Sequence, residues 1–170
     1  MQPHLFDDSP WHDTGAVFDA TRRYRYALWR QWQEECGKSH TLHFIMLNPS
    51  TADEHVLDPT VTRCVLRAQQ LGYRRLVVTN LFAWRSTDPS GLTKVDDPVG
   101  AENDESIHHH AQSSAMTVCA WGNHGGLHGR SEHVLRLLAG IPLYHLGLTK
   151  QQQPTHPLYV SLRKPLQPWN

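Results

Sequence analysis

Four side chains that could bind or activate a small molecule stand just after apolar segments of this sequence. An amide hydrogen-bonds a ligand or a water without titrating, an imidazole donates one hydrogen bond while it accepts another, and an indole stacks on flat rings. If the apolar segments are parallel strands, their carboxyl ends share one edge of a sheet, where open α/β proteins bind ligands. We therefore expect one site that contains Asn48, Asn80, Trp121 and His156.

The stretch 42–53 determines where this site forms. Residues 42–47 are an apolar run that is typical of a buried strand, and Pro49 prevents the strand from continuing past Asn48. The Asn48 amide would then face the space beyond the sheet edge, where it can orient a water but cannot act as a strong base. The alternative is a turn in which Asn48 bonds only to nearby backbone.

Two carboxylates lie in the loop after this strand. Asp53 and Asp58 could each act as a general base or as the ligand of a cation. The alternative is that both residues order the loop, with Asp58 and Pro59 starting a helix. We include Asp53 in the candidate catalytic set.

The elements that would hold these residues are short strands that alternate with amphipathic helices. The apolar pattern predicts strands at residues 24–30, 41–47, 75–80, 116–121 and 143–146. It predicts helices at residues 60–71, 100–113 and 129–139. We therefore expect an α/β fold with three α/β/α layers, in which a mainly parallel sheet of four strands carries one further edge or antiparallel strand at 24–30. The chain should form a single domain, 1–170, with an extended lead-in at 1–20 and a loop-rich basic tail at 148–170.

The composition, with 39% apolar and 19% charged residues and a formal net charge of zero, is that of an ordinary globular chain. No apolar run reaches the length of a bilayer span, and the first residues lack the basic flank and apolar core of a signal peptide. The three cysteines are odd in number and not closely spaced, so we expect reduced thiols in the cytoplasm. We expect a monomer with no membrane partner.

The sequence predicts no cofactor and no metal site. The glycines between residues 122 and 129 lack the spacing of a P-loop or a dinucleotide-binding loop. The consecutive histidines at 108–110 would point in different directions on a helix, and the cysteines are not paired as zinc or iron–sulfur ligands are.

Cations gather locally although the total charge is zero. The segment 148–170 contains no acidic residue, and further arginines should follow strand-end loops. We expect these side chains to contact the phosphates of a nucleic acid, the alternative being cations scattered over the surface. They are Arg63, Arg85, Arg130, Lys150, Arg163 and Lys164.

Several motifs resemble those of an uncharacterised bacterial and phage family. One is Met-Leu-Asn-Pro-Ser-Thr-Ala-Asp at 46–53, and another is His-Pro-Leu-Tyr at 156–159. The other similar segments are 80–83, 97–104, 120–122 and 146–147. The resemblance to this family covers roughly residues 20–163.

More remotely, the order of the strand-end motifs is similar to that of the uracil-DNA glycosylase superfamily. That resemblance implies that Asn48 holds the attacking water and that Asn80 or Phe82 contacts the base. His156 would face a carbonyl of the base. The remaining expected substrate-binding residues are Pro49, Ser50, Trp121 and Lys150.

The function expected from this resemblance is that of a DNA glycosylase, a hydrolase of the N-glycosidic bond that holds a flipped base at the carboxyl ends of the strands. A hydrolase or transferase of free nucleotides or nucleosides is the rival. The zero net charge favours this rival, because DNA-binding proteins usually carry a basic surface. A nucleic-acid or nucleotide binding module without chemistry is the third alternative.

Overall fold

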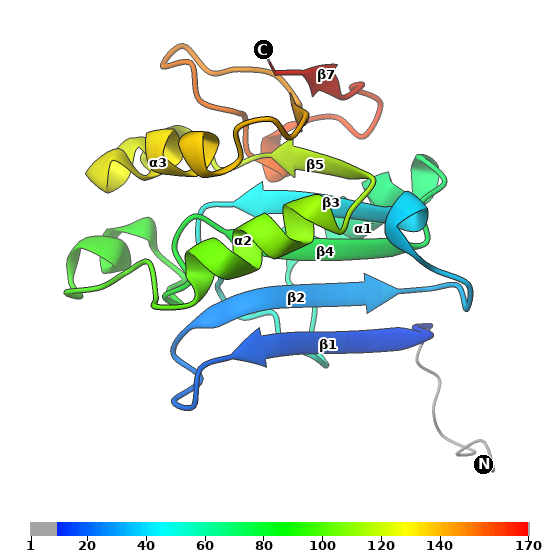
Figure 1. The fold of residues 1–170 in the computed structure, drawn as a ribbon, viewed down its shortest axis with the longest axis horizontal. Helices are drawn as coiled ribbons and strands as arrows, with labels where there is room; N and C mark the ends of the chain where they lie inside the picture. The colour runs from blue at the N-terminus through cyan, green and yellow to red at the C-terminus, as the bar shows by residue number, and fades with distance from the viewer. Residues whose placement is uncertain (1–9, 170) are drawn as a thin grey trace.

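The computed structural model describes residues 10–169, which form one seven-stranded sheet flanked by helices (Figure 1). Along the sheet the strands follow the order β1-β2-β4-β3-β5-β6-β7. Their bounds are β1 (Asp13–Phe18), β2 (Arg25–Gln31), β3 (Thr41–Met46), β4 (Arg75–Asn80), β5 (Met116–Cys119), β6 (Leu143–His145) and β7 (Gln167–Pro168).

The centre of the sheet is β3. It pairs in parallel with β4 on one side and with β5 on the other, and β5 pairs in parallel with β6. The chain therefore leaves β3 toward one side and then crosses to the other side, so that the strand order reverses between β3 and β5. In open α/β sheets a crevice forms at such a point, outside the carboxyl ends of the strands.

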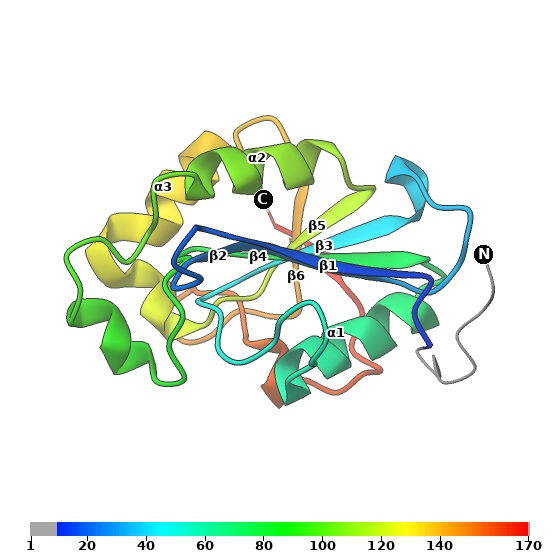
Figure 2. The same ribbon diagram turned by 90° about the horizontal axis from the view of Figure 1, so that it is seen from below.

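Helices cover both faces of the sheet (Figure 2). α1 (Pro59–Gln70) lies on one face, and α2 (Asn103–Gln112) and α3 (Arg130–Leu137) lie on the other. α1 begins where the sequence predicts, because Asp58 accepts the Val61 N–H at 2.8 Å and a proline at the first helical position loses no helical hydrogen bond. No helix between residues 10 and 169 is long and apolar enough to cross a membrane.

The side chains of β3 alternate between two hydrophobic clusters, one on each face of the sheet. Phe44 belongs to the cluster that contains Val65 of α1. Ile45 belongs to the cluster that contains Ile107 of α2 and Val134 of α3. All six residues of β3 are buried, as expected for a parallel strand that is covered on both faces. The end of β3 is thereby fixed in the middle of the molecule.

The parallel centre of a mixed α/β sheet is confirmed, but the sheet has seven strands and not five. β1 lies within the stretch that was expected to be an extended lead-in. β2 pairs in antiparallel with both β1 and β4, so the antiparallel alternative for this strand is confirmed and the edge alternative is wrong. β7, in the tail, pairs with β6. Both extra strands lie at the edges of the sheet, where β1 is only partly buried and β7 is exposed, so they lack the apolar pattern by which strands are predicted. Residues 1–9 of the expected lead-in lie outside the described part of the chain.

Candidate functional site

A cavity of about 460 Å³ lies at the carboxyl ends of β3, β4 and β5, where the strand order reverses. The four residues that were expected to meet at one site all line it, and so do Pro49 and Ser50. Parallel pairing explains this convergence, because it brings the ends of strands that are distant in sequence to one edge. The other polar residues of the lining are Arg25, Asp58, Thr60, Ser86, Thr87, Asn123, His124 and Tyr159.

Asn48 follows β3 and is held by a neighbouring loop. Its Nδ2 donates to the Ser86 carbonyl oxygen at 2.8 Å and to the Pro49 carbonyl oxygen at 3.2 Å. The Ser86 N–H donates in turn to the Pro49 carbonyl oxygen at 2.9 Å, so the two loops are tied together. Both amide hydrogens of Asn48 are thus directed at backbone, which leaves Oδ1 as the acceptor that a water could use.

Arg25 of β2 and Asn80, the last residue of β4, lie together in the buried part of the lining. Each is only 1% exposed. Arg25 Nη2 donates to Asn80 Oδ1 at 3.3 Å, and Nη1 donates to the Ala52 carbonyl oxygen at 2.9 Å. Asn80 Nδ2 and Arg25 Nε have no hydrogen-bond partner among the described residues. Because unpaired buried donors are rare, these two atoms are candidates for contact with a substrate.

Trp121 follows β5 and is tied to the tail of the chain. Its Nε1 donates to Gln153 Oε1 at 2.8 Å, and the Gly122 N–H donates to the Pro154 carbonyl oxygen at 2.8 Å. These bonds hold the segment before His156 against the end of β5. The indole also packs closely on the backbone of the glycine-rich loop that begins at Gly122.

Replacing Gly125 by Ala is expected to displace the Trp121 ring. A Cβ at Gly125 would lie 2.0 Å from Trp121 Cδ1, and overpacking of this kind costs about 1–3 kcal/mol of stability. Urea unfolding should detect the loss. Gly126→Ala is the matched control, because a Cβ there meets nothing within 4 Å. Equal free energies of unfolding for the two variants would contradict the close packing at Gly125.

His156 precedes the short turn Pro157–Tyr159, and its side chain caps that turn. Its Nδ1 accepts the Leu158 N–H at 3.2 Å, so the neutral ring carries its proton on Nε2. Burial lowers the pKa of His156 below the usual 6.5, although the Asp58 carboxylate opposes this shift. At neutral pH the ring is therefore an uncharged hydrogen-bond donor.

Asp58 lines the cavity as the N-cap of α1. Its Oδ1 accepts the Val61 N–H at 2.8 Å, and its Oδ2 accepts the Ser50 hydroxyl at 3.0 Å. The capping role is thus present, and both carboxylate oxygens already have donors. Thr60 and Val61 line the cavity as well, so the positive end of the α1 dipole borders it.

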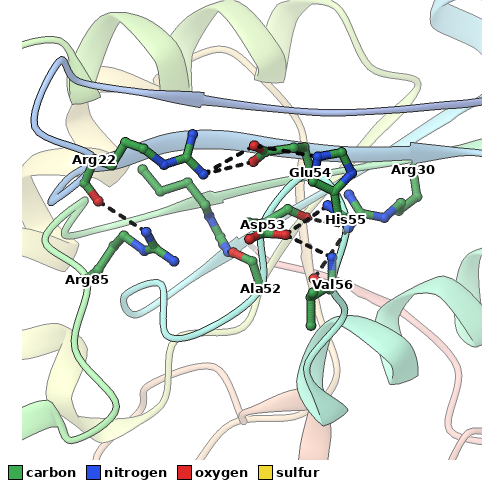
Figure 3. A network of polar contacts seen from close by, with 9 residues as sticks. Arg22, Arg30, Ala52, Asp53, Glu54, His55, Val56 and Arg85 are labelled. Atoms are coloured by element: carbon green, nitrogen blue, oxygen red, sulfur yellow. Dashed lines mark hydrogen bonds and ion pairs between the residues drawn. The ribbon is translucent and has the colours of Figure 1, made fainter.

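Three residues of the expected site do not line the cavity, namely Asp53, Phe82 and Lys150. Figure 3 shows Asp53 turned toward backbone, where its Oδ1 accepts the N–H groups of His55 and Val56, each at 2.8 Å. The bond from His55 and then that from Val56 lower the pKa of Asp53, which makes it a weaker base. Phe82 is fully buried in the cluster beneath α2 and α3, and Lys150 is exposed in a turn. In place of the expected roles, Asp53 orders its loop and Phe82 packs in the core.

Two of the cations that were expected to contact phosphates are used inside the protein. Arg63 Nη2 donates to a backbone carbonyl at 2.7 Å, and Arg130 is buried beside Asp104, with which it forms an ion pair of 2.5 Å. Arg163 and Lys164 are exposed in the tail but do not line the cavity. These four side chains therefore make no contact with the cavity itself.

Arg85 lies on an open groove that adjoins the cavity and also contains Arg22 and Arg23. The residues that the groove and the cavity share are Ser50, Ser86 and Thr87. The guanidinium carbons of Arg22 and Arg85 lie 4.0 and 4.9 Å from the ring centroid of Phe18. Figure 3 shows Arg22 paired with Glu54, at 3.1 Å, and Arg85 bonded to the Arg22 carbonyl oxygen. We call this surface the arginine groove.

Sequence reasoning missed Arg22, Arg23 and Arg25. The alternation at 24–30 is typical of a half-buried strand, on which a basic residue is expected to face solvent. The loop that contains Ala52 instead covers this end of β2 and buries Arg25. The signal in the sequence was the presence of two arginines, Arg25 and Arg30, in an otherwise apolar and aromatic strand, and both are buried.

A family model described as "Protein of unknown function (DUF1643)" matches residues 25–158. The matched span contains every residue that lines the cavity except Tyr159. No curated protein and no solved structure matches the chain.

Proposed function

The chain belongs to this family of unknown function, and from its site we propose that it hydrolyses the N-glycosidic bond of a nucleobase, flipped out of DNA into the cavity. The observation that supports this proposal is the convergence of one set of residues on one cavity, namely Asn48, Asn80, Trp121 and His156. The cavity volume of about 460 Å³ suits a small ligand. The likeness to the uracil-DNA glycosylase superfamily is part of the same proposal.

Base release requires a positioned water and stabilisation of the departing base. Asn48 Oδ1 would orient the water, and the bond from its amide to Ser86 would fix the direction of that oxygen. Because an amide does not titrate, this arrangement suits a dissociative reaction in which the sugar gains positive charge before water attacks. The His156 Nε2–H would donate to a base carbonyl that gains negative charge.

The arginine groove supports the choice of DNA over a free nucleoside or nucleotide as the substrate. It meets the cavity along a shared rim, so a strand whose base enters the cavity could lay its phosphates beside Arg22, Arg23 and Arg85. Phosphate contacts of this kind position a nucleic acid without reading its sequence. The exposed tail cations Lys150, Arg163 and Lys164 remain predicted phosphate contacts.

The double variant Arg23→Ala/Arg85→Ala is expected to weaken DNA binding and to reduce its salt dependence. Each lost phosphate contact lowers the slope of log K against log salt by about one unit, so the slope should fall by about two. Lys38→Ala/Arg136→Ala removes the same charge from exposed positions outside the cavity and the groove and should leave the slope unchanged. Equal slopes for both double variants would exclude the groove as the path of the DNA.

A hydrolase or transferase of free nucleotides is the second candidate. It is favoured by the internal use of Arg63 and Arg130 and by the formal net charge of zero, which together leave a smaller basic surface than most DNA-binding proteins have.

The proposed reaction is tested by measuring free base. The protein is incubated with oligonucleotides that carry normal, deaminated, oxidised and alkylated bases, and in parallel with nucleosides and nucleotides. Release from DNA alone supports the first candidate, and release from mononucleotides supports the second. If no base leaves any of these substrates, the hydrolase proposal is wrong.

A further inference from the structure

The lining of the cavity contains a buried cation that lacks a carboxylate partner. Arg25 is 1% exposed, and its two side-chain hydrogen bonds go to neutral oxygens, those of Ala52 and the Asn80 side chain. Among residues 10–169, Arg25 Nε has no hydrogen-bond partner and no carboxylate forms an ion pair with the Arg25 guanidinium. Burying a charge without a counter-charge is costly, so an anion bound from solution would stabilise the Arg25 guanidinium.

Asn80 adds a second unused donor beside this cation. Its Oδ1 is occupied by Arg25, which orients the amide so that Nδ2 is the remaining group, and Nδ2 has no partner among the described residues. The first turn of α1, at Thr60 and Val61, brings the positive end of a helix dipole to the same cavity. Three features of the lining therefore favour negative charge, namely the Arg25 guanidinium, the free Asn80 Nδ2 and the start of α1.

One residue of the cavity lining, Asp58, disfavours the binding of an anion. The Asp58 carboxylate would repel an anion, but it is itself held by the Val61 N–H and the Ser50 hydroxyl. Burial lowers the pKa of Arg25 to about 10, with Asp58 partly opposing the shift, so the guanidinium stays charged at neutral pH. The lining thus combines positive charge from Arg25 and the start of α1 with one carboxylate, that of Asp58. Both oxygens of this carboxylate already accept hydrogen bonds, which weakens its repulsion of an anion.

We propose that Arg25 and Asn80 bind a compact anionic group of the substrate, a phosphate or a carboxylate, inside the cavity. This inference rests on the proposed function in using the same cavity, and it names the substrate class: a nucleotide held by its own phosphate, or a base that carries a carboxylate. Arg25 would donate from Nε and Asn80 from Nδ2, the two atoms that lack partners. Charge-assisted hydrogen bonds of this kind are the strong ones.

Asn80→Asp gives the sharpest test, because it keeps the shape of the side chain and its bond with Arg25. The new carboxylate replaces the free Nδ2 donor and neutralises the Arg25 guanidinium with a negative charge from the protein itself. We expect it to weaken binding of inorganic phosphate, measured by calorimetry, about tenfold or more, and to leave the thermal midpoint of the phosphate-free protein unchanged or raised. A variant that fails to fold would contradict the account of Arg25 as an unpaired cation.

Two further variants test whether the effect on phosphate binding comes from charge inside the cavity. Asp58→Asn retains a good helix cap and removes the opposing charge, so it should tighten phosphate binding. Gln33→Glu adds the same charge as Asn80→Asp at an exposed position beyond the far end of β2 and should leave binding unchanged. Phosphate binding that is equal in the parent, Asn80→Asp and Asp58→Asn would overturn the assignment.

The source of the anion is tested with matched ligand pairs. A nucleoside monophosphate that binds at least about tenfold tighter than its nucleoside identifies the phosphate, and a pyrimidine carboxylate that outbinds the parent pyrimidine by the same factor identifies the carboxylate. If neither pair differs and inorganic phosphate does not bind, the anion site does not exist. Base release by the parent protein would then still stand on its own, because it is measured separately.

Discussion

Asn48→Ala is expected to fold and to bind substrate but to lose turnover by about 10²–10⁴-fold, as a positioned catalytic group does. The amide is fixed by the Ser86 and Pro49 carbonyl oxygens, which leaves Oδ1 to hold the water. Single-turnover base release at saturating protein measures this step directly.

The same substitution has a structural cost that must be separated from the kinetic one. Losing the bond to Ser86 should lower the free energy of unfolding by about 0.5–1.5 kcal/mol, which leaves the protein folded. Ser86 contributes only its backbone carbonyl to this bond, so urea unfolding of Asn48→Ala measures the structural cost separately from the rate. If Asn48→Ala unfolds and shows no specific kinetic defect, Asn48 is a turn former and nothing more.

Replacing His156 is expected to cost about 10²–10³ in the rate of base release, with little change in substrate affinity. The Nε2–H is the proposed donor to the departing base, whereas Nδ1 accepts the Leu158 N–H and caps the turn. The two nitrogens therefore have different roles, and they can be removed separately.

His156→Asn keeps an acceptor near the position of Nδ1 and removes the donor, whereas His156→Gln keeps a donor near Nε2 and loses the cap. We expect the asparagine variant to show the full loss of rate and the glutamine variant to retain more of it. Single-turnover rates compared with thermal midpoints distinguish the two. If the asparagine variant retains the full rate and the glutamine variant only loses stability, His156 is a cap alone.

The same residue sets the expected pH dependence. Because burial lowers the pKa of His156 below 6.5, the ring stays neutral at pH 6.5 and above, and Nε2 can donate while Nδ1 still accepts. Activity should persist through neutral pH and fall only as the pH drops below 6.5 through the lowered pKa, where Nδ1 becomes protonated. His156 also favours the folded state above 6.5, and this contribution is lost over the same acidic range.

The sequence by itself determined where the central strand ends and which residues stand directly after it. The apolar run 42–47 is stable only when it is buried, as in a central strand. Pro49 ends this strand because its ring fixes φ and it has no N–H to donate, so Asn48 lies at the end of the strand, at the edge of the sheet. The alternation of strands and helices then placed other strand ends at the same edge. Local pattern and chain connectivity were sufficient for this much, including the start of α1 at Asp58.

Only the tertiary structure decided which polar side chains face the cavity. Asp53 and Phe82 stand close in sequence to lining residues, yet one turns to the backbone of its own loop and the other packs beneath α2 and α3. Arg25 entered the site because a distant loop covers its strand, and β1 formed because β2 offered it hydrogen bonds. These outcomes depend on contacts between segments far apart in the chain, which no local periodicity encodes.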